Sequence, residues 1–64
     1  MPIIKVELLP GRTKEQKAEF TRAVTETFVQ VCGGTPQSVH VIFVDVQKSD
    51  WGVNGKMLSE PAAQ

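Results

Sequence analysis

Residues 39–46 form the most strongly β-prone stretch of this sequence, and they are apolar on both faces of the strand that they predict. Near-continuous apolar runs of this kind are typical of parallel strands, which are covered on both sides. A parallel neighbour is reached only through a long crossover connection, most often a helix. The stretch therefore favours folds in which a strand and a helix precede it.

Residues 3–9 supply that first strand, because aliphatic residues dominate there and alternate between faces at a period of two. Pro10 and Gly11 then end it. One face carries Ile4, Val6 and Leu8, and the other carries Ile3, Lys5, Glu7 and Leu9.

A helix is predicted to begin after Thr13, because Thr13 and Gln16 form a capping box that satisfies two free backbone N–H groups. It runs from Lys14 to about Cys32, where Gly33-Gly34 ends it. Its apolar stripe consists of Phe20, Val24, Thr27, Phe28 and Val31, and its polar face of Glu15, Glu19, Arg22 and Glu26. Off the stripe lie three further residues, either scattered exposed apolars or subunit contacts: Ala18, Val29 and Cys32.

The simplest topology joins both strands through this helix as a right-handed β-α-β crossover, with residues 1–64 as a single domain. One helix covers only one face of a two-stranded sheet, so apolar residues on the other face stay in water. Cys32, the only cysteine, forms no internal disulfide and is interpreted as a small buried hydrophobe rather than a reactive thiol. Oligomerisation is therefore the expected source of further stability.

The last third of the chain is predicted to be a polar loop followed by a short hairpin. Trp51 lies in this loop, and Asn54-Gly55 is a favoured two-residue hairpin turn. Residues 59–64, which include Pro61, are typical of a frayed end.

Charge and hydropathy exclude several classes of function. Seven Lys and Arg residues balance seven Asp and Glu residues and are scattered, so no basic footprint for nucleic acid exists. No apolar run is long enough to span a bilayer and no signal sequence precedes the first strand, so we expect a cytoplasmic protein without membrane contact. One cysteine with one histidine cannot form a zinc site of usual composition, so we expect no metal.

Pro2 is the first residue with possible chemistry. Removal of Met1 leaves Pro2 as an amino-terminal secondary amine, and α-amino groups titrate near ~7.7–8.0, close enough to neutrality to act as a general base. The alternative is a proline without chemistry, which fixes φ at a strand start and lacks an N–H that this position can spare.

Parallel neighbouring strands begin at the same edge of a sheet, so Pro2 and His40 should lie together. Arg12 should lie at the opposite end, roughly 25 Å away, and can share a site with Pro2 only from another subunit. Taken singly, Arg12 could be a solvated turn residue and His40 a hydrogen-bonded strand histidine. Trp51 should line either a pocket or an interface.

Taken together, these segments resemble the 4-oxalocrotonate tautomerase family. The resemblance rests on Pro directly after Met, on Leu-Leu-Pro-Gly-Arg-Thr-Lys-Glu-Gln-Lys, on Ser-Val-His-Val-Ile and on Trp-Gly-Val-Asn-Gly, and it extends from Pro2 to about Leu58. It implies an α+β fold of β-α-β subunits with two parallel strands, one long helix and a short C-terminal hairpin, assembled as a homohexamer from three dimers. It further implies a tautomerase of aromatic hydrocarbon catabolism that uses no cofactor.

The resemblance also implies roles for individual residues. Pro2 would be the general base that moves a proton between oxygen and carbon of a small 2-hydroxydienoate or 2-oxo acid such as 2-hydroxymuconate. Arg12 would bind a substrate carboxylate across a subunit boundary, bidentately. The backbone N–H near Leu9 would be a further contact, and Trp51 would form an apolar wall.

His40 departs from the family pattern, because it stands where a second arginine would hold the other end of the substrate. Histidine cannot form the planar fork of a guanidinium, so we expect weaker use of dicarboxylates or a preference for a monoacid enol such as phenylenolpyruvate. Two alternatives stay open. One is a 3-chloroacrylate-type dehalogenase or hydratase, with Asp50 offset from the expected carboxylate position at Val53, and the other is a non-catalytic oligomeric binding protein.

Overall fold

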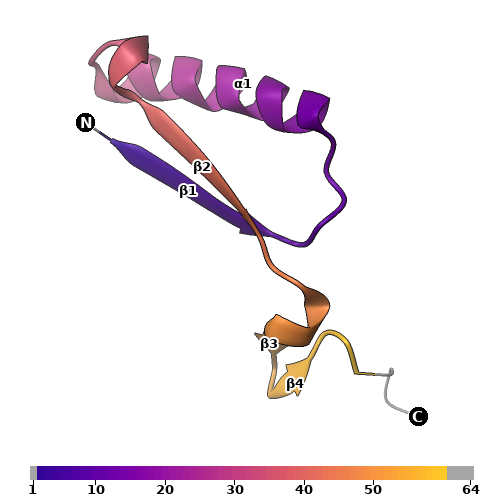
Figure 1. Ribbon diagram of the computed structural model, residues 1–64. Helices are drawn as coiled ribbons and strands as arrows, with labels where there is room; N and C mark the ends of the chain where they lie inside the picture. Colours follow the sequence, from indigo (N-terminus) through magenta and orange to yellow (C-terminus); the bar gives the residue numbers. More distant parts are fainter. Residues whose placement is uncertain (1, 61–64) are drawn as a thin grey trace.

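A computed structural model describes residues 2–60 of the protein. The chain forms a β-α-β unit followed by a small hairpin (Figure 1). Its elements are β1 (Ile3–Leu8), α1 (Lys14–Cys32), β2 (His40–Asp45), β3 (Gly52–Val53) and β4 (Lys56–Met57), with 3-10 turns over Pro36–Ser38 and Lys48–Asp50. The predicted α+β fold is confirmed, and both long strands are shorter than predicted by one or two residues.

β1 and β2 pair in parallel, from Ile3 opposite His40 to Leu8 opposite Asp45. The Val46 N–H donates to the Leu8 carbonyl at 2.8 Å, so one ladder bond continues past the assigned end of β2. The connection through α1 is the long crossover that a parallel pair requires.

The two faces of this sheet differ in cover. α1 lies along one face of the sheet (Figure 1). The half-buried apolar side chains with the parity of that face are Ile4, Val6, Leu8, Val41 and Phe43. On the other face, Ile3 and Ile42 are 65% and 44% exposed. The prediction that one helix leaves an apolar sheet face uncovered is confirmed.

The ends of α1 follow the predicted local chemistry. The Gln16 N–H donates to Thr13 Oγ1 at 3.0 Å, and the Thr13 N–H donates to Gln16 Oε1 at 2.9 Å. An N-cap of this kind stabilises a helix by about 1 kcal/mol. At the other end Gly33 has φ 86°, a value that favours glycine, and its N–H donates to the Val29 carbonyl.

The predicted apolar stripe of α1 is only partly covered. Val24 and Phe28 are half-buried, whereas Phe20 and Thr27 are exposed and Val31 is 77% exposed. A two-stranded sheet is too narrow to cover the whole stripe. The interpretation of Cys32 as a buried hydrophobe is wrong for the single chain, because this last residue of α1 is exposed.

The hairpin extends away from the β-α-β unit (Figure 1). β3 and β4 are antiparallel, and Asn54 and Gly55 both have positive φ, 54° and 80°, as a two-residue turn of this type requires. The Glu60 carboxylate accepts from the Met57 N–H at 2.7 Å, so the predicted fraying is wrong for residues 59–60. Residues 61–64 lie outside the described part.

The single chain has no fully buried residue within the described range 2–60. Its extents of 50 × 23 × 16 Å are those of an elongated body rather than a sphere. A small domain depends on apolar burial for its stability, and this chain retains most of its apolar side chains near water. No helix of the described residues is long and apolar enough to cross a membrane.

Candidate active site

Pro2 and His40 lie together at the amino edge of the sheet, as predicted. The His40 N–H donates to the Pro2 carbonyl at 3.0 Å, which ties the start of the chain to the start of β2. Pro2 is half-buried, while His40 is exposed and stands opposite Ile3 in the register. By its position in the strand alternation, His40 belongs to the face that α1 leaves uncovered.

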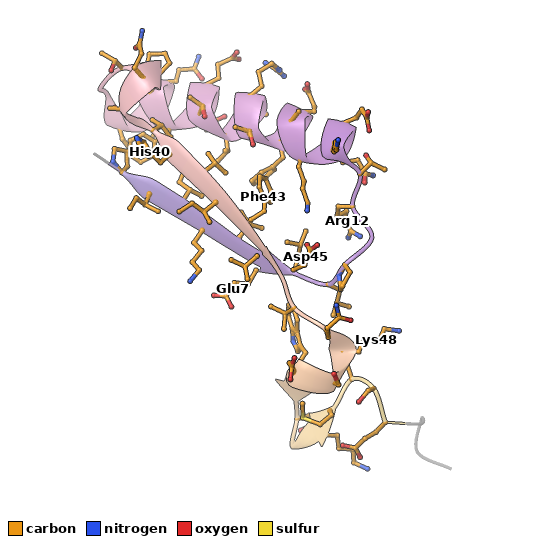
Figure 2. The ribbon with its side chains drawn as sticks, viewed as in Figure 1. Glu7, Arg12, His40, Phe43, Asp45 and Lys48 are labelled. Atoms are coloured by element: carbon orange, nitrogen blue, oxygen red, sulfur yellow. The ribbon has the colours of Figure 1, made fainter. Side chains whose placement is uncertain are left out.

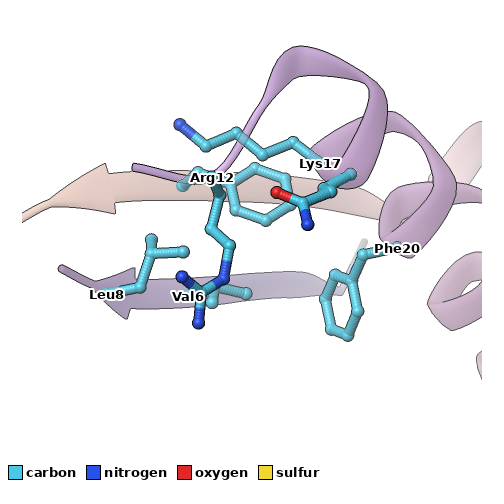
Figure 3. A pocket seen from close by; sticks show the side chains of 7 residues that line it. Val6, Leu8, Arg12, Lys17 and Phe20 are labelled. Carbon is cyan, nitrogen blue, oxygen red and sulfur yellow. The ribbon is translucent and has the colours of Figure 1, made fainter. Parts of the chain in front are cut away.

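Arg12 lies at the opposite end of the sheet, in the turn between β1 and α1 (Figure 2). It lines a cavity of about 220 Å³ beneath the first turns of the helix. The other lining residues are Val6, Leu8, Gln16, Lys17, Phe20 and Phe43. In Figure 3 the Arg12 side chain lies between Leu8 and the Phe20 ring. This cavity combines a guanidinium with apolar and aromatic walls, which suits a carboxylate with an apolar body.

A second cation belongs to the same cavity. Lys17 Nζ lies 3.4 Å from Asp45 Oδ1 and 5.8 Å from the centroid of the Phe43 ring. The rings of Phe20 and Phe43 meet edge to face, with centroids 6.0 Å apart and an interplanar angle of 71°. These contacts link α1 to the end of β2.

Lys17 and Asp45 are two residues of this cavity region that sequence patterns alone did not single out. The sequence did contain a sign of the role of Asp45, because Asp45 lies on the same face of β2 as Val41 and Phe43, which face the helix. A carboxylate on the sheet face that a helix covers is expected to have a cationic or hydrogen-bonding partner on that helix. Its partner could be found only once the register between helix and strand was known.

Trp51 is half-buried and lines a second cavity of about 320 Å³ together with Glu7, Val46, Asp50 and Gly52. Its backbone is held on both sides, since its N–H donates to the Lys48 carbonyl and its carbonyl accepts from the Leu58 N–H at 2.8 Å. Trp51 therefore lines a pocket, which is one of its two predicted positions.

Leu9 follows β1 directly and is half-buried. Within residues 2–60 its N–H donates no hydrogen bond, whereas the preceding carbonyl is engaged by Val46. A backbone donor near the Arg12 turn is thus free to meet a ligand.

The candidate residues fall into two groups at opposite ends of the sheet. Pro2 and His40 occupy the amino edge, and Arg12, Leu9 and Trp51 occupy the carboxyl end. Figure 2 shows His40 and Arg12 at these opposite ends. Six strand residues separate these ends by roughly 20 Å. The single chain therefore does not bring them together. Among the described residues no group of three or more His, Cys, Asp or Glu could hold a metal ion.

Known proteins match this chain over nearly its whole length. The family model described as tautomerase enzyme matches residues 2–60. A protein of Halalkalibacterium halodurans named "Probable tautomerase" is 37% identical over 60 residues, which cover 94% of this chain and 98% of that protein. The 2-hydroxymuconate tautomerase of Bacillus subtilis is 35% identical over 60 residues, which cover 94% of this chain and 97% of that protein.

Solved structures show the same fold. The crystal structure of YwhB, a homologue of 4-oxalocrotonate tautomerase, superimposes with a TM-score of 0.89 at 33% identity, covering 95% of this chain and 100% of that chain. A heterohexamer 4-oxalocrotonate tautomerase from Chloroflexus aurantiacus gives a TM-score of 0.85 at 30% identity, covering 94% of this chain and 97% of that chain. The chain belongs to the tautomerase family, whose enzymes are isomerases.

Proposed function

We propose that this protein is a keto-enol tautomerase that uses no cofactor and acts on 2-hydroxydienoate or enol-pyruvate type 2-oxo acids, such as 2-hydroxymuconate. The observation that carries the proposal is that the family match begins at Pro2, the residue that removal of Met1 leaves as an amino-terminal secondary amine. The 2-hydroxymuconate tautomerase of B. subtilis supports this substrate class.

The proposed chemistry consists of two proton transfers, one from the substrate to Pro2 and one from Pro2 back to the substrate. The neutral Pro2 nitrogen removes the proton of the 2-hydroxyl group, the new carbonyl forms as the double bond shifts, and the resulting ammonium protonates the distant carbon. A retained Met1 makes the Pro2 nitrogen an amide and removes the base.

The residues of the carboxyl end bind and orient the substrate in this proposal. The Arg12 guanidinium grips a carboxylate bidentately and draws electron density away from the reacting carbon. The Leu9 N–H donates to a substrate oxygen, and Trp51 keeps the site apolar. His40 lies beside Pro2 and stands where the family pattern has a second arginine. It offers single N–H donors instead of a planar fork, which favours a monoacid over a dicarboxylate.

The proposal requires an oligomer, because one chain holds its base and its carboxylate-binding arginine at opposite ends of the sheet. We propose a homohexamer built as a trimer of dimers, in which Arg12 of one subunit reaches Pro2 of another. The uncovered apolar face around Ile3 and Ile42 supports such an assembly. The heterohexamer 4-oxalocrotonate tautomerase of C. aurantiacus supports the number of six subunits.

Intact mass and one substitution test the proposal. The native protein should have lost the mass of Met1. Pro2→Ala leaves a primary α-amino group at the start of the chain, so it should lower the rate of enol-to-ketone conversion only in part. A protein that retains Met1 has no amine at this position, and its rate should be about 10²- to 10⁴-fold lower than that of the processed protein, the usual contribution of a general base. Equal rates for both proteins would instead favour a non-catalytic oligomeric binding protein.

A second candidate function is hydration or dehalogenation of a 3-chloroacrylate-type substrate. Asp50 and Glu7 both line the same cavity as Trp51, and a carboxylate there could orient a water molecule. Halide release from 3-chloroacrylate that Asp50→Asn abolishes would favour this function, and absence of release would exclude it.

A further inference from the structure

Two cationic side chains line the Arg12 cavity, and a carboxylate neutralises only one of them. Arg12 and Lys17 both line it, and Asp45 lies 3.4 Å from the Lys17 ammonium. The three charges leave a net charge of +1 beside the apolar walls of the cavity.

Lys17 is held in place rather than free in solvent. Its side chain is 29% exposed, and its ammonium lies near both the Asp45 carboxylate and the face of Phe43. Asp45 is the last residue of β2 and Lys17 stands in the second turn of α1, so the pair spans 28 residues of sequence. A ligand carboxylate that approached Lys17 would have to compete with Asp45.

We propose that Asp45 sets the charge specificity of this cavity by neutralising Lys17, so that the cavity accepts ligands with one carboxylate in preference to ligands with two. The inference rests on the proposed function in that Arg12 is taken to bind the substrate carboxylate. It makes Lys17 and Asp45 specificity-determining residues, with a substrate class of monoacids that carry an apolar or aromatic body.

Two substitutions at this pair separate charge from structure. Asp45→Asn frees Lys17 and raises the net charge to +2, whereas Lys17→Gln leaves Arg12 and Asp45 at a net charge of zero. Both remove the same contact between α1 and β2. A structural role therefore predicts similar effects of the two variants, and a charge role predicts opposite ones. Glu26→Gln makes an equal charge change on the exposed back of α1 and serves as the control.

The probes are benzoate and isophthalate, which share one ring and differ by one carboxylate. Their dissociation constants are measured by NMR titration of the assembled protein, without turnover. We expect Asp45→Asn to improve isophthalate binding relative to benzoate by about two- to fivefold, as partly exposed charge pairs allow. Lys17→Gln should shift the same ratio in the opposite direction, and Glu26→Gln should leave it unchanged.

The result that overturns the inference is a ratio that moves in the same direction in both variants, or that moves no further than in Glu26→Gln. If Asp45→Asn fails to assemble, Lys17→Gln alone decides, because an unchanged ratio there contradicts the inference. The binding assay needs no Pro2. A shifted ratio in a protein without tautomerase activity would support the charge inference and reject the proposed function.

Discussion

The two ends of the β1-β2 sheet carry different kinds of residues. At the amino edge Pro2 and His40 are joined through a backbone hydrogen bond, and in the proposed function they supply the base and a hydrogen-bond donor. At the carboxyl end Arg12 and Trp51 line two cavities, one of them shaped by the Lys17–Asp45 pair. In the proposed function, proton transfer and substrate binding are divided between these two ends of one chain. The complete site that we propose would combine the amino edge of one subunit with the carboxyl end of another.

Of the substitutions predicted here, one in the uncovered sheet face should have the largest effect on assembly and activity. In Ile42→Asp a charge enters an apolar face that we expect a second copy to cover, and burial of an unpaired charge is strongly unfavourable. The oligomer should dissociate, with loss of activity and of most of the thermal stability, as measured by analytical ultracentrifugation and thermal unfolding. The control Gln30→Asp, on the exposed side of α1, should stay assembled. An assembled and active Ile42→Asp protein would contradict the predicted interface.

Mixing two weakened proteins tests whether the ends of different chains meet. Arg12→Ala should lower kcat/KM roughly 10- to 150-fold, because hydrogen bonds to charged groups contribute about 1.5–3 kcal/mol. In hexamers formed from equal amounts of chains that retain Met1 and of Arg12→Ala chains, about a quarter of the sites combine a free Pro2 amine with an intact Arg12 by random assembly of equivalent subunits. Activity should then rise well above that of either variant alone.

No recovery after co-assembly would mean that Pro2 and Arg12 of the same chain form the site, against the separation across the sheet. Each variant subjected alone to the same unfolding and reassembly is the control.

The sequence predicted local features and the parallel pairing of the strands, but not the side-chain contacts between α1 and the sheet. Strand parity, the Thr13–Gln16 capping box and the Asn54-Gly55 turn depend on neighbouring residues, and the structure confirms all three. The Lys17–Asp45 pair depends on how α1 is placed along β2, and hydrophobic periodicity leaves that placement open.

Exposure was predicted less well than secondary structure. Cys32 and Val31 lie on a helix that a two-stranded sheet covers only in part, so their exposure depends on the width of the sheet. The composition of the candidate site could likewise be predicted only in part. The separation of Pro2 from Arg12 follows from the sequence, but the subunit arrangement that would bring them together does not.

His40→Arg tests the role proposed for His40 at the amino edge. A guanidinium beside Pro2 restores the forked donor that a second carboxylate needs, and a charged hydrogen bond exceeds a neutral one by about 1 kcal/mol. Turnover of 2-hydroxymuconate should rise about fivefold. Turnover of phenylenolpyruvate should change little, and it provides the internal control. Unchanged or lower kinetics with 2-hydroxymuconate would contradict the role proposed for His40.

The smallest effect concerns an ion pair that lies outside both ends, on the exposed back of α1. Arg22 Nη2 donates to Glu19 Oε2 at 2.6 Å, and this hydrogen bond together with the positive charge of Arg22 lowers the pKa of the Glu19 carboxyl. A lowered carboxyl pKa contributes stability above its unfolded value near 4.5, and the contribution is lost as the pH falls through the folded pKa. Because both side chains are mostly exposed, the contribution is small.

Glu19→Gln should therefore melt slightly below the native protein at pH 7, and the difference should shrink as the pH falls below about 4.5 and through the lowered pKa of the folded state. Thermal unfolding at a series of pH values measures it, with the same substitution in an Arg22→Gln background as the matched control. In that background the pH dependence should be absent. A difference that grows in acid would show that Glu19 acts through something other than its ionised form.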